Sequence, residues 1–375
     1  MKLVVFGPGH PFRGGIASTT TDLVKALVER EHDIVFATPH RQYPQWLYPG
    51  PKDQDPDVCE KLSCAQALLD PLNALSWYGT RRKALEIRAD AWIMPYWTWA
   101  WAGLWLSLLK RPGRPPVVGI VHNPADHGAH RVQRWAARAV LGRCEALFTH
   151  AEVLAENLRS NYPKVTVSQH PIAIPDAGVL CDRTSARQTL GWPEKGRVAL
   201  FLGFIRPYKG VDVLIDAISR LPKDSSWRLV IAGEAWGDLQ QVLTRQVERL
   251  GLGERVELRF GWVAENDVSL LFAACDLVVL PYRSGSQSAV APKALAHGVP
   301  VLSTAVGGLP EIIEPGVNGM LVEAGSAEAL SDALQELDGE TLVRCAAGAK
   351  ASVAHLSWAS YAARLESLID AAIRR

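Results

Sequence analysis

The chain contains 375 residues, which is more than one hydrophobic core usually serves, so two domains are expected. Apolar residues make up 48% of the sequence and charged residues 21%, a balance that is ordinary for a soluble globular enzyme. The 40 basic and 39 acidic residues nearly cancel and form no basic block, which argues against a nucleic-acid partner.

The N-terminus and the cysteines favour a cytoplasmic protein, with the inner face of the membrane as one alternative location. Residues 1–6 form a strand-like apolar run that is too short for the apolar core of a signal peptide. The cysteines show no CxxC or Cys/His zinc spacing, so we interpret them as reduced and mostly buried: Cys59, Cys64, Cys144, Cys181, Cys275 and Cys345.

The first half of the chain alternates short apolar strands with stretches of helical periodicity. This alternation predicts a mostly parallel sheet that is covered on both faces by helices. The expected strands are 3–6, 34–37, 93–96, 117–121, 146–148 and 165–168, and the first helix is expected over 16–30.

A glycine-rich loop, 7–15, joins the first strand to the first helix. Ligands of open parallel sheets bind at the carboxyl ends of strands, and helix N-termini attract anions. Gly14 and Gly15 directly precede the helix and Arg13 lies beside them, which favours a loop that faces an acceptor or a phosphate. The fit to the dinucleotide fingerprint is poor, and a purely structural turn is the alternative.

The segment 91–109 is almost uncharged, carries five tryptophans and approaches the length of a membrane span. Pro95 interrupts it, so we interpret it as a buried strand followed by a helix. Trp97, Trp101 and Trp105 share one helical face. That face either packs in the core, which we prefer, or docks on a membrane with help from the basic residues after it: Lys110, Arg111 and Arg114.

Two histidines follow the strand 117–121, on the side where a ligand is expected. His122 could donate a hydrogen bond to a sugar hydroxyl, and an ordinary pKa near neutrality would keep it adaptable. A structural role is the alternative for His122, and a solvent-facing position is the alternative for His127. His170, in the sequence Gln-His-Pro at the expected crossing between domains, is interpreted as structural.

Loop-forming residues between 172 and 196 mark the expected domain boundary, because proline and glycine cluster there. A second strand series then begins, at 198–202, 229–232, 256–260, 277–280, 299–303 and 320–322. We therefore expect an N-terminal domain over 1–172, a linker over 173–196 and a second domain over 197–353. A C-terminal helix over about 358–373, within the segment 354–375, is expected to pack back on the first domain.

A pair of cations, Arg206 and Lys209, lies between a strand and a helix expected over 211–220. Cations there oppose the helix dipole, whereas a bound diphosphate would be favoured by both side chains and by free backbone N–H groups. The stretch 203–210 resembles the Gly-x-x-x-x-x-Lys-Gly segment of the retaining GT-B glycosyltransferases of family 4. The resemblance implies that Arg206 and Lys209 hold the donor diphosphate and neutralise the leaving group.

The later signatures of that family are also matched, in order and spacing. The stretch 278–301 resembles its donor-binding block, and 306–311 and 316–319 resemble its next two signatures. The family resemblance also implies that His122 lies by the transferred sugar, and that the fold is GT-B, with two Rossmann-like doubly wound domains facing a cleft. The expected donor-binding residues are Gly203, Ser286, Gln287, Ser288, Ala289, Gly307, Gly308 and Glu311, the last of which could instead cap a helix near Ile312.

One departure from the family concerns two glutamates spaced seven residues apart, whose positions align with Gly285 and Lys293. The string after Tyr282 looks like a subfamily in which Ser286, Gln287 and Ser288 replace that pair. The alternative is that the loop has decayed and the protein is an inactive sugar-nucleotide-binding protein.

The sequence therefore predicts retaining transfer of a hexosyl unit from a nucleotide diphosphate sugar, a co-substrate, to a hydroxyl acceptor. The resemblance implies that the second domain binds the donor and the first domain binds the acceptor. A lipid-linked acceptor and a role in surface polysaccharide synthesis are further possibilities, the latter from a weak likeness around His10 and 42–44. No metal and no cofactor are implied, since the 53–55 Asp-x-Asp lies in a proline-rich loop. A nucleotide-sugar 2-epimerase on the same fold is the rival enzyme.

Overall fold

A computed structural model describes residues 1–42, 54–55, 62–123, 131–174 and 181–375 of the chain. The chain divides into two compact units, and the first is built from two separate stretches, Met1–Pro175 and Leu356–Arg375. The second unit is the continuous stretch Asp176–His355.

Among its described residues, the first unit holds a seven-stranded sheet in the order β3-β2-β1-β4-β5-β6-β7. Every strand pair in it is parallel. The strands are β1 (Lys2–Phe6), β2 (Asp33–Pro39), β3 (Ala65–Leu69), β4 (Ala91–Tyr96), β5 (Val117–Val121), β6 (Ala146–Thr149) and β7 (Thr166–Gln169). The sheet is mostly buried because β1, β4, β5 and β6 are nearly continuous apolar runs.

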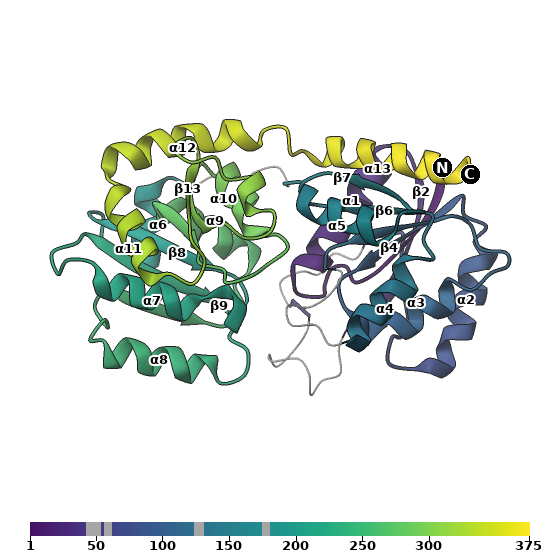
Figure 1. Cartoon of the computed structure of the whole chain (residues 1–375), viewed down its shortest axis with the longest axis horizontal. Coiled ribbons are helices and arrows are strands. Elements are labelled where there is room, and N and C mark those ends of the chain that lie inside the picture. Colours follow the sequence, from purple (N-terminus) through teal and green to yellow (C-terminus); the bar gives the residue numbers. More distant parts are fainter. Residues whose placement is uncertain (43–53, 56–61, 124–130, 175–180) are drawn as a thin grey trace. The chain divides into compact units, whose positions relative to one another are not determined.

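Helices cover both faces of this sheet (Figure 1). On one face the core is formed by α2, α3, α4 and α5, and on the other by α1 and α13. These helices, with two 3-10 turns, are α1 (Gly15–Glu29), η1 (Ala74–Ser76), α2 (Trp77–Glu86), η2 (Trp99–Trp101), α3 (Ala102–Leu108), α4 (Arg131–Leu141), α5 (Glu152–Asn161) and α13 (Trp358–Ile373).

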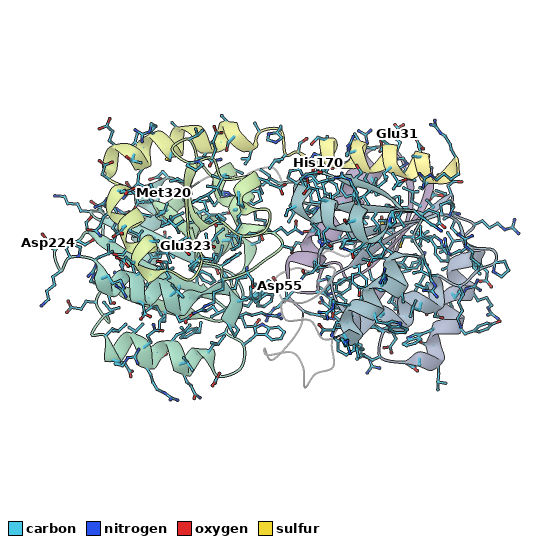
Figure 2. The ribbon with its side chains drawn as sticks, in the orientation of Figure 1. Glu31, Asp55, His170, Asp224, Met320 and Glu323 are labelled. Carbon is cyan, nitrogen blue, oxygen red and sulfur yellow. The ribbon has the colours of Figure 1, made fainter. Side chains whose placement is uncertain are left out.

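The C-terminal helix α13 belongs to the first unit. Tyr361, Leu365 and Ile369 are fully buried in the core on this face, where the helix packs against β5, β6 and α1. His170, labelled in Figure 2, lies just after β7, and its Nε2 is 3.1 Å from the Ser360 hydroxyl of this helix. The helix begins at a capped residue, since the Ser357 hydroxyl accepts from the Ser360 N–H.

The second unit repeats the architecture with a parallel sheet in the order β10-β9-β8-β11-β12-β13. The strands are β8 (Arg197–Leu202), β9 (Trp227–Gly233), β10 (Val256–Phe260), β11 (Leu277–Leu280), β12 (Val301–Thr304) and β13 (Gly319–Val322). Its helices and 3-10 turns are α6 (Arg183–Leu190), η3 (Pro207–Lys209), α7 (Val211–Arg220), α8 (Leu239–Arg249), α9 (Glu265–Ala274), α10 (Val290–Ala296), η4 (Leu309–Glu311), α11 (Ala327–Glu336) and α12 (Gly339–Val353).

Both sheets confirm the predicted doubly wound α/β fold, and each places its first strand in the interior. Strand order reverses between β1 and β4 in the first sheet and between β8 and β11 in the second. In open α/β sheets the crevice at such a reversal, at the carboxyl ends of the strands, is where ligands bind.

The edge strand β3 and the helix α6 were not predicted from the sequence. Gln66 interrupts the short apolar run of β3, and most of that strand is half-buried or exposed. Helix α6 lies inside the stretch 173–196 that was expected to be a linker. Its buried face includes a charged residue, Arg187, which hides the apolar periodicity of the helix.

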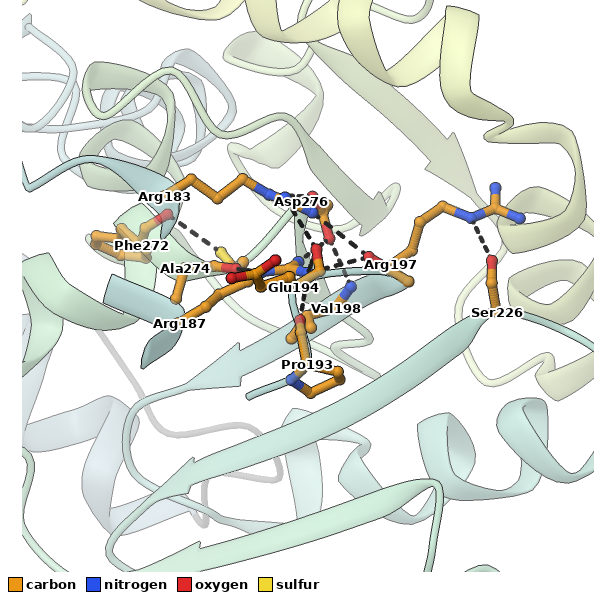
Figure 3. A network of polar contacts seen from close by, with 12 residues as sticks. Arg183, Arg187, Pro193, Glu194, Arg197, Val198, Ser226, Phe272, Ala274 and Asp276 are labelled. Atoms are coloured by element: carbon orange, nitrogen blue, oxygen red, sulfur yellow. Dashed lines mark hydrogen bonds and ion pairs between the residues drawn. The ribbon is translucent and has the colours of Figure 1, made fainter. Parts of the chain in front are cut away.

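Arg187 is completely buried and is satisfied by a dense set of acceptors (Figure 3). Its guanidinium donates to the Asp276 carboxylate at 2.6 Å and to the carbonyls of Ala274, Pro193 and Gly196. The same Asp276 oxygen accepts from the Val198 N–H at 2.7 Å. The pair therefore ties α6 to the starts of β8 and β11.

The tryptophan-rich segment 91–109 forms β4, η2 and α3, and its shared face is core. Trp101 is 1% exposed and its ring centroid lies 4.7 Å from that of Trp97 and 5.4 Å from that of Trp105. The membrane-docking alternative for this face is therefore wrong, and Arg111 and Arg114 both pair with Glu145 instead. Within the described residues, none of the helices has the length and apolarity that crossing a bilayer requires.

Candidate functional site

Three loops meet at the carboxyl edge of the second sheet, after β8, β11 and β12. They carry the residues that the sequence predicts to bind a donor. Because β8 and β11 flank the strand-order reversal, the first two loops border the crevice where this fold binds ligands. Local contacts fix the three loops to one another.

The loops after β8 and β11 are joined by a close backbone approach. Gly210 has a φ of 67°, and a Cβ placed on it would lie 2.0 Å from the Pro281 carbonyl oxygen, so only glycine fits. The Arg283 backbone N–H donates to the Tyr208 carbonyl at 2.8 Å. The Arg283 guanidinium donates to both carboxylate oxygens of Asp212. This bidentate pair ties the first turn of α7 to the loop after β11.

The loop after β12 is held against the loop after β11 in the same way. A Cβ on Gly307 would lie 2.1 Å from the Gly285 carbonyl oxygen, and the Gly308 N–H donates to the Ser286 carbonyl at 2.9 Å. The structure therefore brings together Gly307, Gly308 and Ser286, which the sequence predicts to act at one site.

The guanidinium of Arg206 lies over an aromatic ring. Its guanidinium carbon is 3.6 Å from the ring centroid of Trp236, in the loop after β9. Two backbone hydrogen bonds fix this platform, from the Trp236 N–H to the Ile205 carbonyl and from the Ile205 N–H to the Glu234 carbonyl. Stacking occupies the face of a guanidinium and leaves its in-plane N–H donors available to an anion.

Lys209 is partly buried in η3, with its ammonium nitrogen 3.8 Å from the ring centroid of Tyr282. Loss of solvent, with a smaller contribution from the positive charge of Arg206, lowers the pKa of Lys209 to about 8. A bound diphosphate would oppose both effects. The charged form of Lys209 is therefore energetically unfavourable when no anion is bound, and a bound anion would stabilise it.

Tyr282 and Ser288 form the floor of the loop after β11. Their hydroxyls lie 3.2 Å apart, and the Ser288 oxygen also accepts from the Val290 N–H at the start of α10. Burial raises the pKa of Tyr282 to about 12, so its phenol is neutral. Ser288 is therefore engaged inside the protein, whereas the buried amide oxygen of Gln287 has no hydrogen-bond partner within the described chain.

Gly285 and Lys293, which the sequence comparison aligned with two glutamates, have ordinary environments. The Lys293 ammonium pairs with Glu265 on α9 at 2.8 Å. A Cβ on Gly285 would make only an ordinary contact with Tyr282, 3.5 Å away. Glu311 is exposed and is the last residue of η4, and a turn follows at Ile312.

The glycine-rich loop of the first unit follows β1, next to that sheet's strand-order reversal. Gly14 precedes α1 with a φ of 107°, and Gly15 has open space where a side chain would be. Arg13 is half-buried beside them. The predicted residues of this loop are thus at one helix start, as the sequence indicated.

His122 directly follows β5, but it does not have the adaptable charge that the sequence analysis expected. It is buried, and loss of solvent lowers its pKa to about 4, so it is neutral near pH 7. It borders a cavity of about 10 Å³ together with Tyr361 of α13, which is close to the space one water needs. Behind it lies the ring of His150, whose centroid is 4.8 Å away and which stacks on Tyr361.

Some predicted positions lie outside the described residues: His127, Tyr43, Pro44, Asp53 and Cys59. Within the rest of the chain, no group of three or more metal-ligating side chains is assembled.

Sequence reasoning missed Trp236 and His150. Trp236 lies in the loop after β9, only three residues past the strand's last residue, Gly233. An aromatic residue in such a loop, beside a predicted cationic loop, was the available signal. His150 directly follows β6 as His122 follows β5, and this parallel was visible in the sequence.

Two family models match the chain, one in each unit. The model described as "Glycosyl transferase 4-like domain" matches residues 14–171, and "Glycosyl transferases group 1" matches residues 182–351. D-inositol 3-phosphate glycosyltransferase of Corynebacterium glutamicum (strain R) is 34% identical over 195 residues, which cover 50% of this chain and 46% of that protein. The protein of the same name from Mycobacterium bovis (strain BCG / Pasteur 1173P2) is 35% identical over 185 residues, covering 48% and 37%. The match thus spans less than half of these relatives.

Solved structures share the fold over the full chain at low sequence identity. Sucrose-phosphate synthase from Thermosynechococcus elongatus has a TM-score of 0.80 at 19% identity and covers 99% of both chains. Anabaena Alr3699/HepE in complex with UDP-glucose has a TM-score of 0.78 at 19% identity, covering 98% of this chain and 99% of that one.

Proposed function

Because the chain belongs to the group 1 glycosyltransferases, which have the GT-B fold, we propose that it is a retaining hexosyltransferase. The donor is a nucleotide diphosphate sugar and the acceptor a hydroxyl group. Relatives named as D-inositol 3-phosphate glycosyltransferases support the reaction class, and a structure of the same fold holds UDP-glucose.

The observation that carries this proposal is the placement of two cations at the strand-order reversal of the second sheet. Arg206 is oriented by Trp236, and Lys209 is partly desolvated against Tyr282. Both follow β8 and precede α7, whose N-terminal N–H groups also favour an anion. A diphosphate would supply negative charge to balance the two cations, and oxygens to accept hydrogen bonds from their N–H groups and from those at the start of α7.

In the proposed reaction the bond between the sugar's anomeric carbon and the diphosphate oxygen breaks. A new bond forms from that carbon to the acceptor oxygen on the same face. The acceptor's proton passes to the leaving phosphate, so no protein base is required. Arg206 and Lys209 stabilise the negative charge that develops on the leaving group, a form of catalysis that preorganised charges perform well.

The contacts to the sugar and to the ribose come from the loops after β11 and β12. The free amide oxygen of Gln287 supports a role as acceptor for a donor hydroxyl. Backbone N–H groups at Ser286 to Ala289, together with Gly307 and Gly308, would complete the donor site. The ion pair of Lys293 with Glu265 supports a structural reason for a lysine where the family has a glutamate.

The first unit is proposed to bind the acceptor through Arg13, Gly14, Gly15 and His122. A neutral, buried imidazole is suited to hydrogen bonding with a sugar hydroxyl and is poorly suited to carrying charge.

The test is a panel of nucleotide diphosphate sugars incubated with the full chain and candidate hydroxyl acceptors, including sugar-phosphate and lipid-linked ones. Release of a nucleoside diphosphate together with a glycosylated acceptor supports the proposal. Acceptor-independent change of the donor sugar would instead identify an epimerase. Donor binding in calorimetry without turnover on any acceptor would identify a binding protein.

A further inference from the structure

We propose that the outer face of α4 docks the protein on an anionic membrane surface. The surface consists of solvent-facing residues of α4, a helix of the first unit. It shares no residue with the donor site or with the buried face of Trp97, Trp101 and Trp105.

The buried and exposed positions of α4 fall on opposite sides of the helix. The core side consists of Ala136, Ala137, Val140 and Leu141. The outer side, which we call the α4 face, consists of Arg131, Val132, Arg134, Trp135 and Arg138, all of which are exposed. At 100° per residue these five positions span less than half of the helix circumference.

The α4 face is purely cationic in its charge. The eleven residues Arg131–Leu141 include three arginines and no aspartate or glutamate. Arg134 and Arg138 are four residues apart on one side of the helix, a spacing at which like charges repel. An anionic surface would relieve this repulsion, so the charge of the α4 face is complementary to acidic lipid headgroups.

Large apolar side chains lie among these arginines. Trp135 is 66% exposed and Val132 is 63% exposed. Helix α4 also packs against η2, whose Trp99 is 46% exposed. Tryptophan favours the boundary between lipid and water because its ring is apolar and its N–H is polar. Arginine and exposed tryptophan together are the chemistry of a peripheral lipid contact, whereas a soluble anion would need the charges alone.

The position of α4 allows its outer side to contact a membrane surface while its buried side remains packed in the core. It lies beside α3 on the face of the first sheet opposite α13 (Figure 1). The buried side of α4 holds it to the fold, so the outer side can contact lipid headgroups without any helix leaving the core.

The experiment is co-sedimentation of the full chain with lipid vesicles. One set contains phosphatidylcholine alone, and the other contains about one quarter phosphatidylglycerol, an anionic lipid. The wild-type protein should bind the anionic vesicles, should ignore the neutral ones, and should be released at about 0.5 M salt, where charges are screened within a few ångströms.

The variant R131Q/R134Q/R138Q should lower the partition coefficient on anionic vesicles by roughly a hundredfold, since each basic residue near such a surface contributes about fivefold. Trp135→Ala should weaken binding several-fold while leaving its salt dependence in place. The matched control R220Q/R245Q/R249Q removes the same charge from exposed positions of α7 and α8 and should bind like the wild type. All substituted side chains are exposed, so thermal unfolding should be unchanged.

Three results would overturn the proposal: wild-type protein that ignores anionic vesicles at low salt, a triple α4 variant that binds like the wild type, or a control variant that loses binding equally. The last result would mean that net charge acts without a defined face. Glycosyl transfer to a water-soluble acceptor should be the same in all these variants, which separates this test from that of the proposed activity.

Discussion

The guanidinium of Arg206 rests on the indole of Trp236, with 3.6 Å between the guanidinium carbon and the ring centroid. The two residues come from neighbouring loops, after β8 and after β9. The stack restricts a long, flexible side chain to one plane before any ligand arrives. A cation that is oriented in advance loses less conformational freedom when it binds an anion.

Removing the platform should therefore weaken catalysis less than removing the cation. We expect Arg206→Ala to lower kcat by tenfold to a thousandfold, the rough scale for one charge-stabilising group. Trp236→Ala should lower kcat/KM by about twofold to thirtyfold, the value of a cation–π contact of about 0.5–2 kcal/mol. Steady-state kinetics check both, with Trp236→Phe as the control that keeps a ring. Equal activity in Trp236→Ala and wild type would remove the positioning role.

The affinity for a nucleoside diphosphate should depend on the charge of Lys209. Its pKa is about 8 in the free protein, so the ammonium is charged below that pH and neutral above it. Binding should weaken as the pH rises from 7.5 to 9.5 in the wild type, by calorimetry. Lys209→Arg stays charged throughout this range and should give a flat profile. If the arginine variant shows the same fall, another group is titrating.

Activity should persist in excess EDTA. Arg206 and Lys209 supply positive charge where a divalent ion would otherwise balance the leaving diphosphate. The measurement is release of nucleoside diphosphate with EDTA, and again after adding Mg²⁺ or Mn²⁺ in excess. A complete loss that either ion restores would contradict the expected mechanism.

Truncating the buried tryptophan face should destabilise the first unit. Trp101 is 1% exposed between Trp97 and Trp105, so Trp101→Ala should cost roughly 3–5 kcal/mol in the free energy of unfolding. Trp99→Ala is the matched control, because that ring is 46% exposed and should change stability by less than about 0.5 kcal/mol. Chemical denaturation distinguishes them, and similar losses in both variants would mean that Trp101 is not core.

Neutralising Asp276 should destabilise the second unit. Arg187 is fully buried, and Asp276→Asn would leave its guanidinium without a counter-charge. Removing one member of a buried pair costs about 3–5 kcal/mol. Arg183→Gln, at the exposed side of the same carboxylate, should have a small effect by the same denaturation measurement. A mild Asp276→Asn variant would show that water reaches Arg187.

Much of the fold was predictable because buried parallel strands consist of short runs of apolar residues, which are visible in the sequence. Helices α7 and α13 were predicted close to their observed bounds, since each has a strong apolar stripe. The strand β3 was missed because Gln66 interrupts its short apolar run and most of this edge strand is half-buried or exposed. Helix α6 was missed because its buried face includes Arg187, whose partners lie far along the chain.

The sequence was enough to identify the loops that carry the candidate site, but it was not enough to predict the contacts between those loops. Gly210 and Gly307 could be read as special positions, but the carbonyls that exclude a side chain there belong to other loops. The same holds for the stack of Arg206 on Trp236, which joins residues 30 positions apart in sequence. The low pKa of His122 arises from burial under tertiary structure, which no local pattern records.

The split composition of the first unit has a consequence for the order of folding. Its first 175 residues leave the ribosome early, but the residues of α13 that cover β5 and β6 on one face are made only after the second unit. The second unit is continuous and can complete its core while translation is still under way, since domains fold as units when their chain is available. The unit whose synthesis begins first is therefore completed after the second unit, and until α13 is made the strands that it covers are open to aggregation.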